Sequence, residues 1–257
     1  MSRKQLDNFV RLLKASPSGA LFNPWWQIDE ENDIGRIAPI IRRQQLRAYV
    51  QERLGRAKLL VIGEALGYRG GHFTGIPMTS ERLLLGRNKE FRLTPNHFFS
   101  DINPRRTSKP EKCPDGFSEP TATIVWGTLL RLGLKPEQFV LWNAFPWHSF
   151  DSRRGMLSNR MPNKSERAAG LPVLKAFLEL FSCDQVVALG KIAAAQLEEL
   201  NVNADCVRHP ASGGAKLFRH QIAKIVNKAP SARSRRLRLF AIKGSDAASE
   251  TNPGFSS

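Results

Sequence analysis

Asn143 is the first residue whose type and position suggest chemistry. It stands among apolar neighbours in the run FVLWNA at 139–144, where a side-chain amide is costly unless it is paired. A carboxamide both donates and accepts hydrogen bonds, so it could read the Watson–Crick edge of a base. The alternative is an asparagine that only caps local backbone. The position therefore indicates either a base-reading amide or a local structural contact.

A histidine at the start of a loop of small residues is the second candidate. His209 begins the stretch HPASGGAK at 209–216. Backbone N–H groups at the start of a following helix suit a phosphate, and an imidazole suits an anion that forms on a substrate. A lone histidine is more often structural. The place of this one, at the end of an apolar run and inside a phosphate-type loop, favours the functional interpretation.

A glycine-rich stretch is the third feature with a chemical meaning. Five glycines occur in the thirteen residues 63–75, directly after the apolar run KLLVI. Glycine lets backbone N–H groups approach a ligand closely. The stretch matches neither the GxGxxG pattern nor a P-loop. Taken alone, it fits many nucleotide-binding proteins.

The elements that must position these residues are short apolar runs separated by helical patterns. Four runs are typical of buried parallel strands: 58–63, 139–144, 184–190 and 204–209. Amphipathic patterns predict helices at 1–15 and 37–56, and further helical spacing lies between the later runs. Strands that alternate with helices predict an α/β fold with parallel pairing. Ligands of such folds bind at the carboxyl ends of the strands, where the three motifs stand.

The charge of the chain points to an anionic partner. Its 257 residues include 39 Lys+Arg and 23 Asp+Glu, a net charge of +16. Ten basic residues and no acidic one lie in 208–243: Arg208, Lys216, Arg219, Lys224, Lys228, Arg233, Arg235, Arg236, Arg238 and Lys243. Such clustering is typical of phosphate binding, and a basic surface kept for solubility is the alternative. No apolar run approaches the roughly 18 residues of a membrane span, so a membrane is the weaker partner.

The cysteines and the N-terminus indicate a cytoplasmic protein. Cys113, Cys183 and Cys206 are too few and too scattered for a disulfide framework or a CxxC-type metal site. The stretch 1–14 lacks the apolar core of a signal peptide. We therefore expect reduced thiols, no metal and no cofactor in a cytoplasmic protein.

Together the motifs resemble those of the uracil-DNA glycosylase superfamily. That superfamily carries a first motif of GE(A/G)PG or GQDPY type, an asparagine on the next strand and a late motif of HPS type. This chain has GEALG at 63–67, Asn143 and HPAS at 209–212, in the same order. The resemblance implies a three-layer α/β/α sandwich around a four-stranded parallel sheet. We expect one domain over 1–244, with 88–120 as a long loop or insertion and 245–257 as a disordered tail.

The activity that this resemblance implies is monofunctional base excision. Uracil flipped out of DNA would enter a pocket at the strand ends, and hydrolysis would leave an abasic site. Asn143 would bind the uracil edge, His209 would stabilise the uracil anion, and Glu64 would orient the water; a structural hydrogen bond from Glu64 to the glycine loop is the alternative. The implied uracil-binding residues are Glu64, Ala65, Leu66, Gly67, Tyr68, Phe73, Met78, Asn143 and His209. The implied DNA contacts are Arg160, Ser212, Gly213, Gly214, Lys216 and Arg219.

The chain also departs from the superfamily's patterns. Enzymes with a GQDPY-type motif have an aspartate where Ala65 stands, and the stacking phenylalanine is replaced by Met78. We expect Phe73, Tyr68 or the Met78 sulfur to contact the base instead. Three cysteines cannot supply the iron–sulfur cluster of the GE(A/G)PG branch, so no cluster is expected. Some relatives carry a bulky wedge where Gly213 and Gly214 lie.

Several predictions about substrate and partner remain open. The wedge could come from Leu217 or Phe218, and weak wedging would favour single-stranded DNA or pre-opened mismatches. The base could instead be hypoxanthine or a mismatched thymine. A catalytically inactive DNA-binding module is the alternative outside the enzymes, although it would not need a base-reading amide and an anion-stabilising imidazole. We expect a monomer that binds uracil-containing single- or double-stranded DNA.

Overall fold

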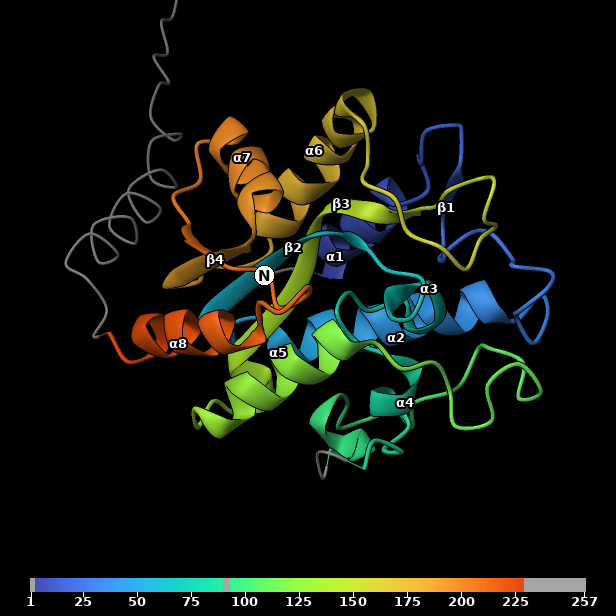
Figure 1. Cartoon of the computed structure of the whole chain (residues 1–257), viewed down its shortest axis with the longest axis horizontal. Coiled ribbons are helices and arrows are strands. Elements are labelled where there is room, and N and C mark those ends of the chain that lie inside the picture. The colour runs from blue at the N-terminus through green and yellow to red at the C-terminus, as the bar shows by residue number, and fades with distance from the viewer. Residues whose placement is uncertain (1–2, 90–92, 229–257) are drawn as a thin grey trace, which may run out of the picture.

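A computed structural model of the chain describes residues 3–89 and 93–228 (Figure 1). The tail expected at 245–257 lies outside the described residues. So do five of the ten clustered basic residues, namely Arg233, Arg235, Arg236, Arg238 and Lys243. The other five all have exposed side chains: Arg208, Lys216, Arg219, Lys224 and Lys228.

Five strands form one sheet in the order β1-β3-β2-β4-β5. The strands are β1 (Leu21–Phe22), β2 (Leu59–Leu66), β3 (Phe139–Ser149), β4 (Gln185–Leu189) and β5 (Asp205–Val207). The four strands expected from the apolar runs are present and run parallel. The expectation of a four-stranded sheet is wrong, because β1 adds a fifth strand that pairs antiparallel with the end of β3. Two residues are too short to show an apolar pattern in the sequence.

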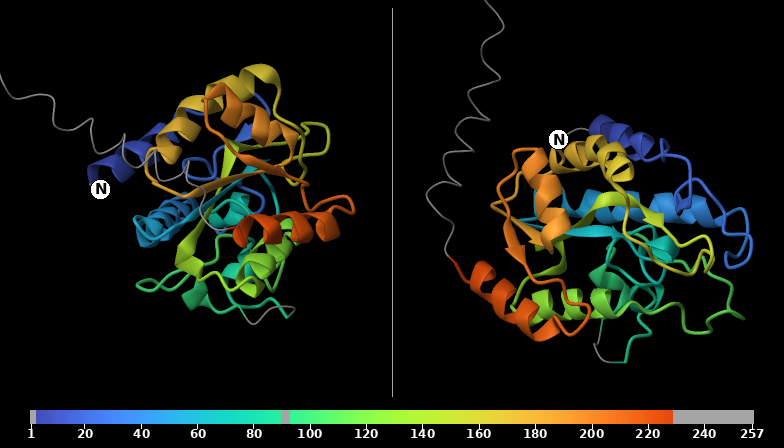
Figure 2. Two further views of the ribbon diagram at one scale, coloured as in Figure 1. Left: turned by 90° about the vertical axis from the view of Figure 1, so that its left-hand side faces the viewer. Right: turned by 45° about the horizontal axis from the view of Figure 1, so that its top comes forward.

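Helices cover both faces of this sheet and make three layers. They are α1 (Arg3–Leu12), α2 (Ala38–Arg53), α3 (Gly71–Thr74), α4 (Glu81–Leu84), α5 (Pro120–Arg131), α6 (Lys164–Leu178), α7 (Lys191–Glu199) and α8 (Ala215–Val226), with short 3₁₀ turns η1 (Pro95–His97) and η2 (Pro136–Gln138). Helices α1, α6 and α7 lie on one face, whereas α5 and α8 lie on the other (Figures 1 and 2). No helix within the described ranges is both long and apolar enough to cross a membrane.

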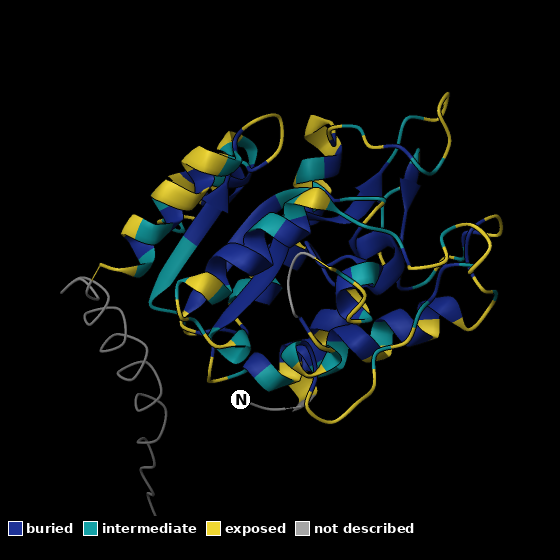
Figure 3. Cartoon of the chain, turned by 60° about the horizontal axis from the view of Figure 1, so that its bottom comes forward, coloured by how far each residue is buried: buried dark blue, intermediate teal, exposed yellow. Residues whose placement is uncertain are grey.

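The central strands β2 and β3 form the buried core, as Figure 3 shows. On one face the indole of Trp142 stacks on Phe177 of α6 and contacts the ring of Phe9 of α1 edge-on. Helix α2 packs along the edge of β3 that β1 leaves free. There the Tyr49 hydroxyl accepts a hydrogen bond from the Leu141 N–H at 2.8 Å, and Arg53 Nε donates to the Phe139 carbonyl at 3.2 Å. These contacts satisfy backbone groups that an edge strand would otherwise expose.

The stretch 88–120, apart from 90–92, is mostly irregular and runs from α4 to α5. Its middle is fixed by a buried carboxylate, because Glu81 Oε1 accepts hydrogen bonds from the backbone N–H groups of Thr107 and Ser108. The side chains of Phe98 and Phe99 are buried in the core. The stretch therefore packs on the domain and delivers the chain to the start of α5.

The pairing of β2 with β3 becomes irregular at the carboxyl ends of the strands. Ala65 lies opposite Phe145, but the next residue, Leu66, lies opposite His148. The two extra residues on β3 include Pro146, which has no N–H to give to the sheet. This bulge separates the strand ends next to the glycine-rich stretch, and a bulge at such a place commonly re-aims side chains at a site.

Candidate active site

A cavity of about 380 Å³ opens at the carboxyl ends of β2, β3 and β5. Its volume lies within the range of roughly 300–1,000 Å³ that is usual for small-molecule sites. We call it the strand-end cavity. Its lining combines residues from all three sequence motifs: Gly63, Glu64, Ala65, Leu66, Gly67, Met78, Glu119, Thr121, Asn143, Asn159, Arg160, Met161, His209 and Ala211.

Asn143 presents an unused acceptor at this cavity. The residue is buried, and its Oδ1 has no hydrogen-bond partner among the described residues. Gly63 on the neighbouring strand makes room for the amide, because a Cβ there would lie 2.5 Å from Asn143 Oδ1 and 3.3 Å from Met78 Sδ. An unpaired buried carbonyl oxygen is costly. A bound donor, such as the N–H of a base edge, would satisfy it.

Met78 forms the wall next to this amide. Its backbone has a φ of 49°, in the left-handed region that residues other than glycine seldom adopt. The side chain is almost fully buried and faces Gly63. Strained backbone of this kind collects at binding sites. Of the three side chains considered for stacking on the base, Met78 is the one that lines the cavity.

His209 directs one defined imidazole nitrogen toward a ligand. Its Nδ1 accepts a hydrogen bond from the Ala211 N–H at 3.1 Å, so the proton of the neutral ring stands on Nε2. Burial, together with the nearby charge of Arg208, lowers the pKa of His209 below its ordinary value and keeps the ring neutral at pH 7. The side chain therefore offers one N–H donor to an anion without carrying a charge itself.

Two carboxyl groups share the strand-end cavity. Glu64 is half-buried, and burial raises its pKa while the charge of Arg167 on α6 acts in the opposite direction. Glu119 immediately precedes α5, and no motif in its part of the sequence marks it as a site residue. The Oε2 atom of Glu119 is buried without a hydrogen-bond partner among the described residues. Burial raises the pKa of Glu119 to about 7.

Two aromatic residues expected to stack on the base do not reach the cavity lining. The ring of Phe73 is fully buried and stacks on Phe117 with centroids 4.2 Å apart, so the prediction that it contacts a base is wrong. Tyr68 is half-buried beside the cavity. Its ring lies under the guanidinium of Arg69, and its backbone N–H donates to Asn159 Oδ1 at 3.1 Å. It acts here through its backbone, by fixing a residue of the lining.

Arg160 has a structural role rather than the predicted DNA contact. Its guanidinium makes two hydrogen bonds to the Glu166 carboxylate and further ones to the carbonyls of Phe150, Met161 and Ala20. A guanidinium has five N–H groups, and these contacts use all five. None remains free for a phosphate. The sequence could not reveal that one carboxylate and three carbonyls converge on this side chain.

The loop after His209 leads into α8 with small and basic residues. Ser212 and Gly213 are exposed and have left-handed backbones, with φ values of 51° and 75°. Gly214 is buried, and the position requires glycine because a Cβ there would overlap the His209 carbonyl oxygen. Lys216 and Arg219 follow on the first turns of α8, both exposed. The segment that follows the imidazole in the chain is therefore exposed and positively charged.

Two exposed apolar side chains lie on segments that contribute to the cavity lining or follow it in the chain. Leu217 on the first turn of α8 is 50 % exposed, and Met161 in the cavity lining is 60 % exposed. Phe218 is fully buried, so it cannot serve as the wedge considered for DNA. Leu217 is the one of the two candidates whose side chain is accessible.

Comparison with known proteins decides the family. The sequence profile of the uracil-DNA glycosylase superfamily matches residues 52–253, which is more than half of the chain. The chain belongs to the uracil-DNA glycosylase superfamily. It is therefore a DNA glycosylase, a hydrolase of base excision repair that acts on DNA. A comparison with curated protein sequences gave no match.

A solved structure confirms the fold of this glycosylase. The crystal structure of wild-type SMUG2 from Pedobacter heparinus resembles it with a TM-score of 0.56 and 15 % sequence identity. The match covers 94 % of this chain and 99 % of the other. At this identity the likeness concerns the fold, namely an α/β sheet flanked by helices.

A buried polar chain supports the glycosylase site from behind. His72 of α3 contacts Asp29 through Nε2 at 3.1 Å and His148 through Nδ1 at 3.0 Å. His148 Nε2 donates to the Ser158 carbonyl at 2.7 Å, directly before Asn159 of the cavity lining. Burial lowers the pKa of His148 to about 4, so its ring is neutral at pH 7. These hydrogen-bonded side chains connect the glycine-rich stretch with the loop between β3 and α6.

Loss of this connection should destabilise the glycosylase. We expect His148→Ala to lower the free energy of unfolding by about 3 kcal/mol, because it leaves a cavity and unpaired buried polar groups. Urea denaturation at pH 7.5 measures this change. His220→Ala, at an exposed position on α8, is the matched control and should change the value by less than about 0.5 kcal/mol. Equal urea midpoints for both variants would show that the hydrogen bonds of His148 contribute no net stability.

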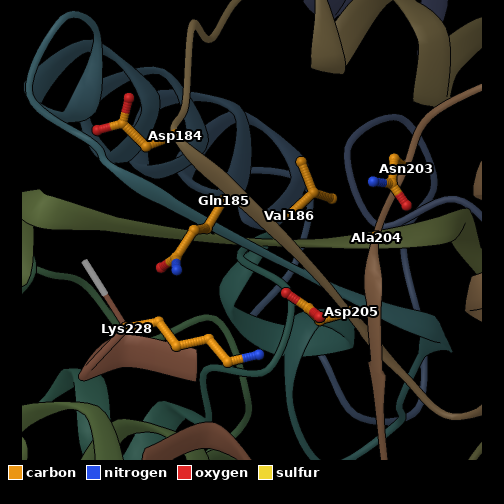
Figure 4. Close-up of a pocket in the computed structure, with 7 residues that line it drawn as sticks. All are labelled: Asp184, Gln185, Val186, Asn203, Ala204, Asp205 and Lys228. Atoms are coloured by element: carbon orange, nitrogen blue, oxygen red, sulfur yellow. The ribbon is translucent and has the colours of Figure 1, made fainter. Parts of the chain in front are cut away.

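A second cavity lies at the opposite end of the sheet. It has a volume of about 270 Å³ and is lined by Asp184, Gln185, Val186, Asn203, Ala204, Asp205 and Lys228 (Figure 4). All of them except Lys228, which follows α8, lie at the amino ends of β4 and β5, away from the end where α/β folds bind ligands. Within the described residues, no group of three or more His, Cys, Asp or Glu side chains is placed to hold a metal ion.

Proposed function

We propose that this glycosylase flips uracil out of DNA and hydrolyses its N-glycosidic bond, leaving an abasic site. The observation that carries the proposal is that two groups line the same strand-end cavity: an unpaired amide oxygen on Asn143 and a neutral imidazole on His209. Uracil offers an N3–H donor with a neighbouring O4 acceptor at one edge and an O2 acceptor beside N1. The two protein groups match these edges.

In this mechanism Asn143 binds the edge of the base, and His209 stabilises the anion that forms on it. Asn143 Oδ1 accepts the N3–H of the base, and its amide N–H donates to O4. As the C1′–N1 bond breaks, its electron pair moves into the base and charge builds on O2. The His209 Nε2–H donates to that oxygen, and a preorganised donor of this kind stabilises an anion most effectively in a water-poor site. Water then bonds to C1′ of the oxocarbenium-like sugar.

A carboxyl group is proposed to position this water. From the sequence we assigned the role to Glu64, and Glu64 does line the cavity. Glu119, which precedes α5, also lines this cavity. Ala65, Leu66 and Gly67 are proposed to contact uracil through their backbone, and Met78 through its sulfur and methyl group. We propose that the protein acts as a monomer, in the cytoplasm.

The loop 212–214 and the first turns of α8 are proposed to hold the DNA backbone. Ser212 and Gly213 offer backbone N–H groups beside the start of a helix, which attracts phosphate. The Gly214 N–H already donates to the Ala211 carbonyl at 3.1 Å, so Gly214 is proposed to contribute by leaving room for the DNA backbone. Lys216 and Arg219 add positive charge on the same side as His209. Leu217 is proposed as the wedge that enters the base stack when the nucleotide turns out.

Salt dependence tests this DNA contact. We expect Lys216→Ala to reduce the slope of log K against log salt concentration by about 1 in binding to double-stranded DNA, since each phosphate contact contributes roughly that amount. Fluorescence anisotropy at several salt concentrations measures the slope. Lys175→Ala, which removes an exposed lysine of α6 on the other face of the sheet, should leave it unchanged. An unchanged slope in Lys216→Ala would exclude Lys216 as a phosphate contact.

A substrate panel tests the proposed base. Single- and double-stranded oligonucleotides that contain uracil, hypoxanthine or a G·T mismatch are incubated with the protein and then treated with alkali to cut abasic sites. We expect scission at uracil. Hypoxanthine also pairs an N–H with a neighbouring carbonyl, so excision of hypoxanthine alone would keep the Asn143 role and change the substrate. If no substrate is cut, the enzyme interpretation is wrong and the protein is an inactive DNA-binding module.

A further inference from the structure

The two carboxyl groups of the strand-end cavity lie on different sides of β2. Successive side chains of a strand point to opposite faces. The Cβ direction of Gly63 faces Met78 and Asn143, so the side chain of Ala65 points to that face as well. Glu64 points to the other face, where α6 lies, and the charge of Arg167 on α6 acts on its carboxyl group. Glu64 therefore already has a positive charge, that of Arg167, acting on its carboxyl group.

Glu119 lies on the face of Ala65. The helix that it precedes, α5, is bound to the segment of Met78 because the Trp126 Nε1–H donates to Thr79 Oγ1 at 3.1 Å. Figure 1 shows the amino end of α5 beside α3, on the face opposite α6. A carboxyl group at this place faces the side of the cavity where β2 offers only Gly63 and Ala65.

The glycine-rich stretch is shaped to admit this carboxyl group. A Cβ at Gly67 would lie 3.1 Å from Glu119 Oε1, and a Cβ at Gly70 would overlap Glu119 Oε2. Neither glycine has a left-handed backbone, so the need at both positions is for space. The carboxyl group occupies the space that ordinary side chains at 67 and 70 would fill, and Oε2 meets no donor there. Because Glu119 also lines the strand-end cavity, its carboxyl group can meet a ligand there.

We propose that Glu119 is a catalytic residue that binds the attacking water and accepts its proton. This inference rests on the proposed function. In the step, the C1′–N1 bond breaks and its electron pair leaves with the base, whose O2 is held by the His209 Nε2–H. The water oxygen bonds to C1′, and one water proton passes to the Glu119 carboxylate. When the products leave, the Glu119 proton returns to solvent and the base anion takes up one proton at N1, so the enzyme ends each cycle unchanged.

The surroundings of Glu119 suit a general base at neutral pH. Burial raises its pKa to about 7. The positive end of α5 favours the carboxylate form. The other titratable or charged groups around the site are Glu64, Tyr68 and Arg69 on the glycine-rich stretch, His72 behind it, His209 after β5, and Arg160, whose charge is paired with Glu166. A base is most effective when its pKa lies near the working pH.

Single-turnover rates over pH 5.5–9 test the proposal. We expect Glu119→Gln to lower the rate on uracil-containing single-stranded DNA at pH 8 about 100-fold or more, the usual contribution of a general base. In the wild type the rate should rise with pH through a pKa near 7, and in Glu119→Gln this rise should disappear. Glu119→Asp should recover part of the rate, because it keeps the carboxylate. Glu199→Gln, at an exposed position of α7, should behave as the wild type.

Two further measurements separate the possible failures. Glu119→Gln should unfold at the wild-type temperature and bind the same DNA with wild-type affinity, which excludes misfolding. If Glu119→Gln keeps the wild-type rate and pH profile, the proposal is wrong. If Glu119→Gln keeps the wild-type rate and Glu64→Gln loses it, Glu64 is the residue that binds the attacking water. A wild-type protein that releases no base from any substrate would contradict the proposed function itself.

Discussion

Replacing His209 with alanine is expected to slow base release about 10²–10³-fold, the usual loss when one donor to a developing anion is removed. The structure gives the physical reason. The Ala211 N–H occupies Nδ1, so the only proton of the neutral ring stands on Nε2. That N–H is fixed before the substrate binds, and no rearrangement is needed when charge develops on the base.

Single-turnover kinetics at saturating enzyme measures this loss apart from DNA binding. His220→Ala on α8 removes an exposed imidazole and should keep the wild-type rate. The rate of the wild type should also fall in acid, because protonation of Nδ1 breaks the bond to the Ala211 N–H. The lowered pKa of His209 places this fall below the ordinary pKa of histidine. Wild-type kinetics in His209→Ala would remove the imidazole from the mechanism.

Replacing Asn143 with alanine is expected to lower kcat/KM about 100-fold. The estimate assumes two hydrogen bonds to the base, each contributing about 1.4 kcal/mol. Affinity for undamaged DNA should stay unchanged, because the residue lies inside the cavity and is buried. Steady-state kinetics on a uracil-containing oligonucleotide, with anisotropy on the matching undamaged one, measures both quantities.

Gly63→Ala provides an independent test of the same contact. Its methyl group would lie 2.5 Å from Asn143 Oδ1 and 3.3 Å from Met78 Sδ, so the amide must move away from its position. We expect a loss of kcat/KM similar to that of Asn143→Ala, with cooperative unfolding preserved. Full activity in Gly63→Ala would show that the amide position seen here does not matter for the base.

Much of the site could be predicted from the sequence because each motif follows its own strand. Short apolar runs marked β2, β3, β4 and β5, and parallel pairing brings their carboxyl ends together. Asn143 and His209 therefore met in one cavity although 66 positions separate them in the chain. The chemistry of an amide among apolar residues and of a histidine beside small residues was readable before any contact was known.

What could not be predicted depends on contacts between distant segments. Glu119 lies about fifty residues from Gly67 and Gly70, and only the packing of α5 brings its carboxyl group to them. In the sequence, Glu119 is only a glutamate before the proline that starts a helix, and this pattern does not predict a contact with the glycine-rich stretch. Arg160 had the right type for a phosphate contact, but its N–H groups are used within the fold. Phe73 had the right ring, but it points into the core.

Detection of the released base tests the central claim most directly. Purified protein is incubated with a single-stranded oligonucleotide that contains one uracil, and both products are identified by mass spectrometry without alkali. The proposed mechanism predicts free uracil and an uncut strand with one abasic site, and neither product from His209→Ala on the same time scale. An unchanged oligonucleotide, or a strand cut by the protein itself, would contradict monofunctional hydrolysis of uracil from DNA.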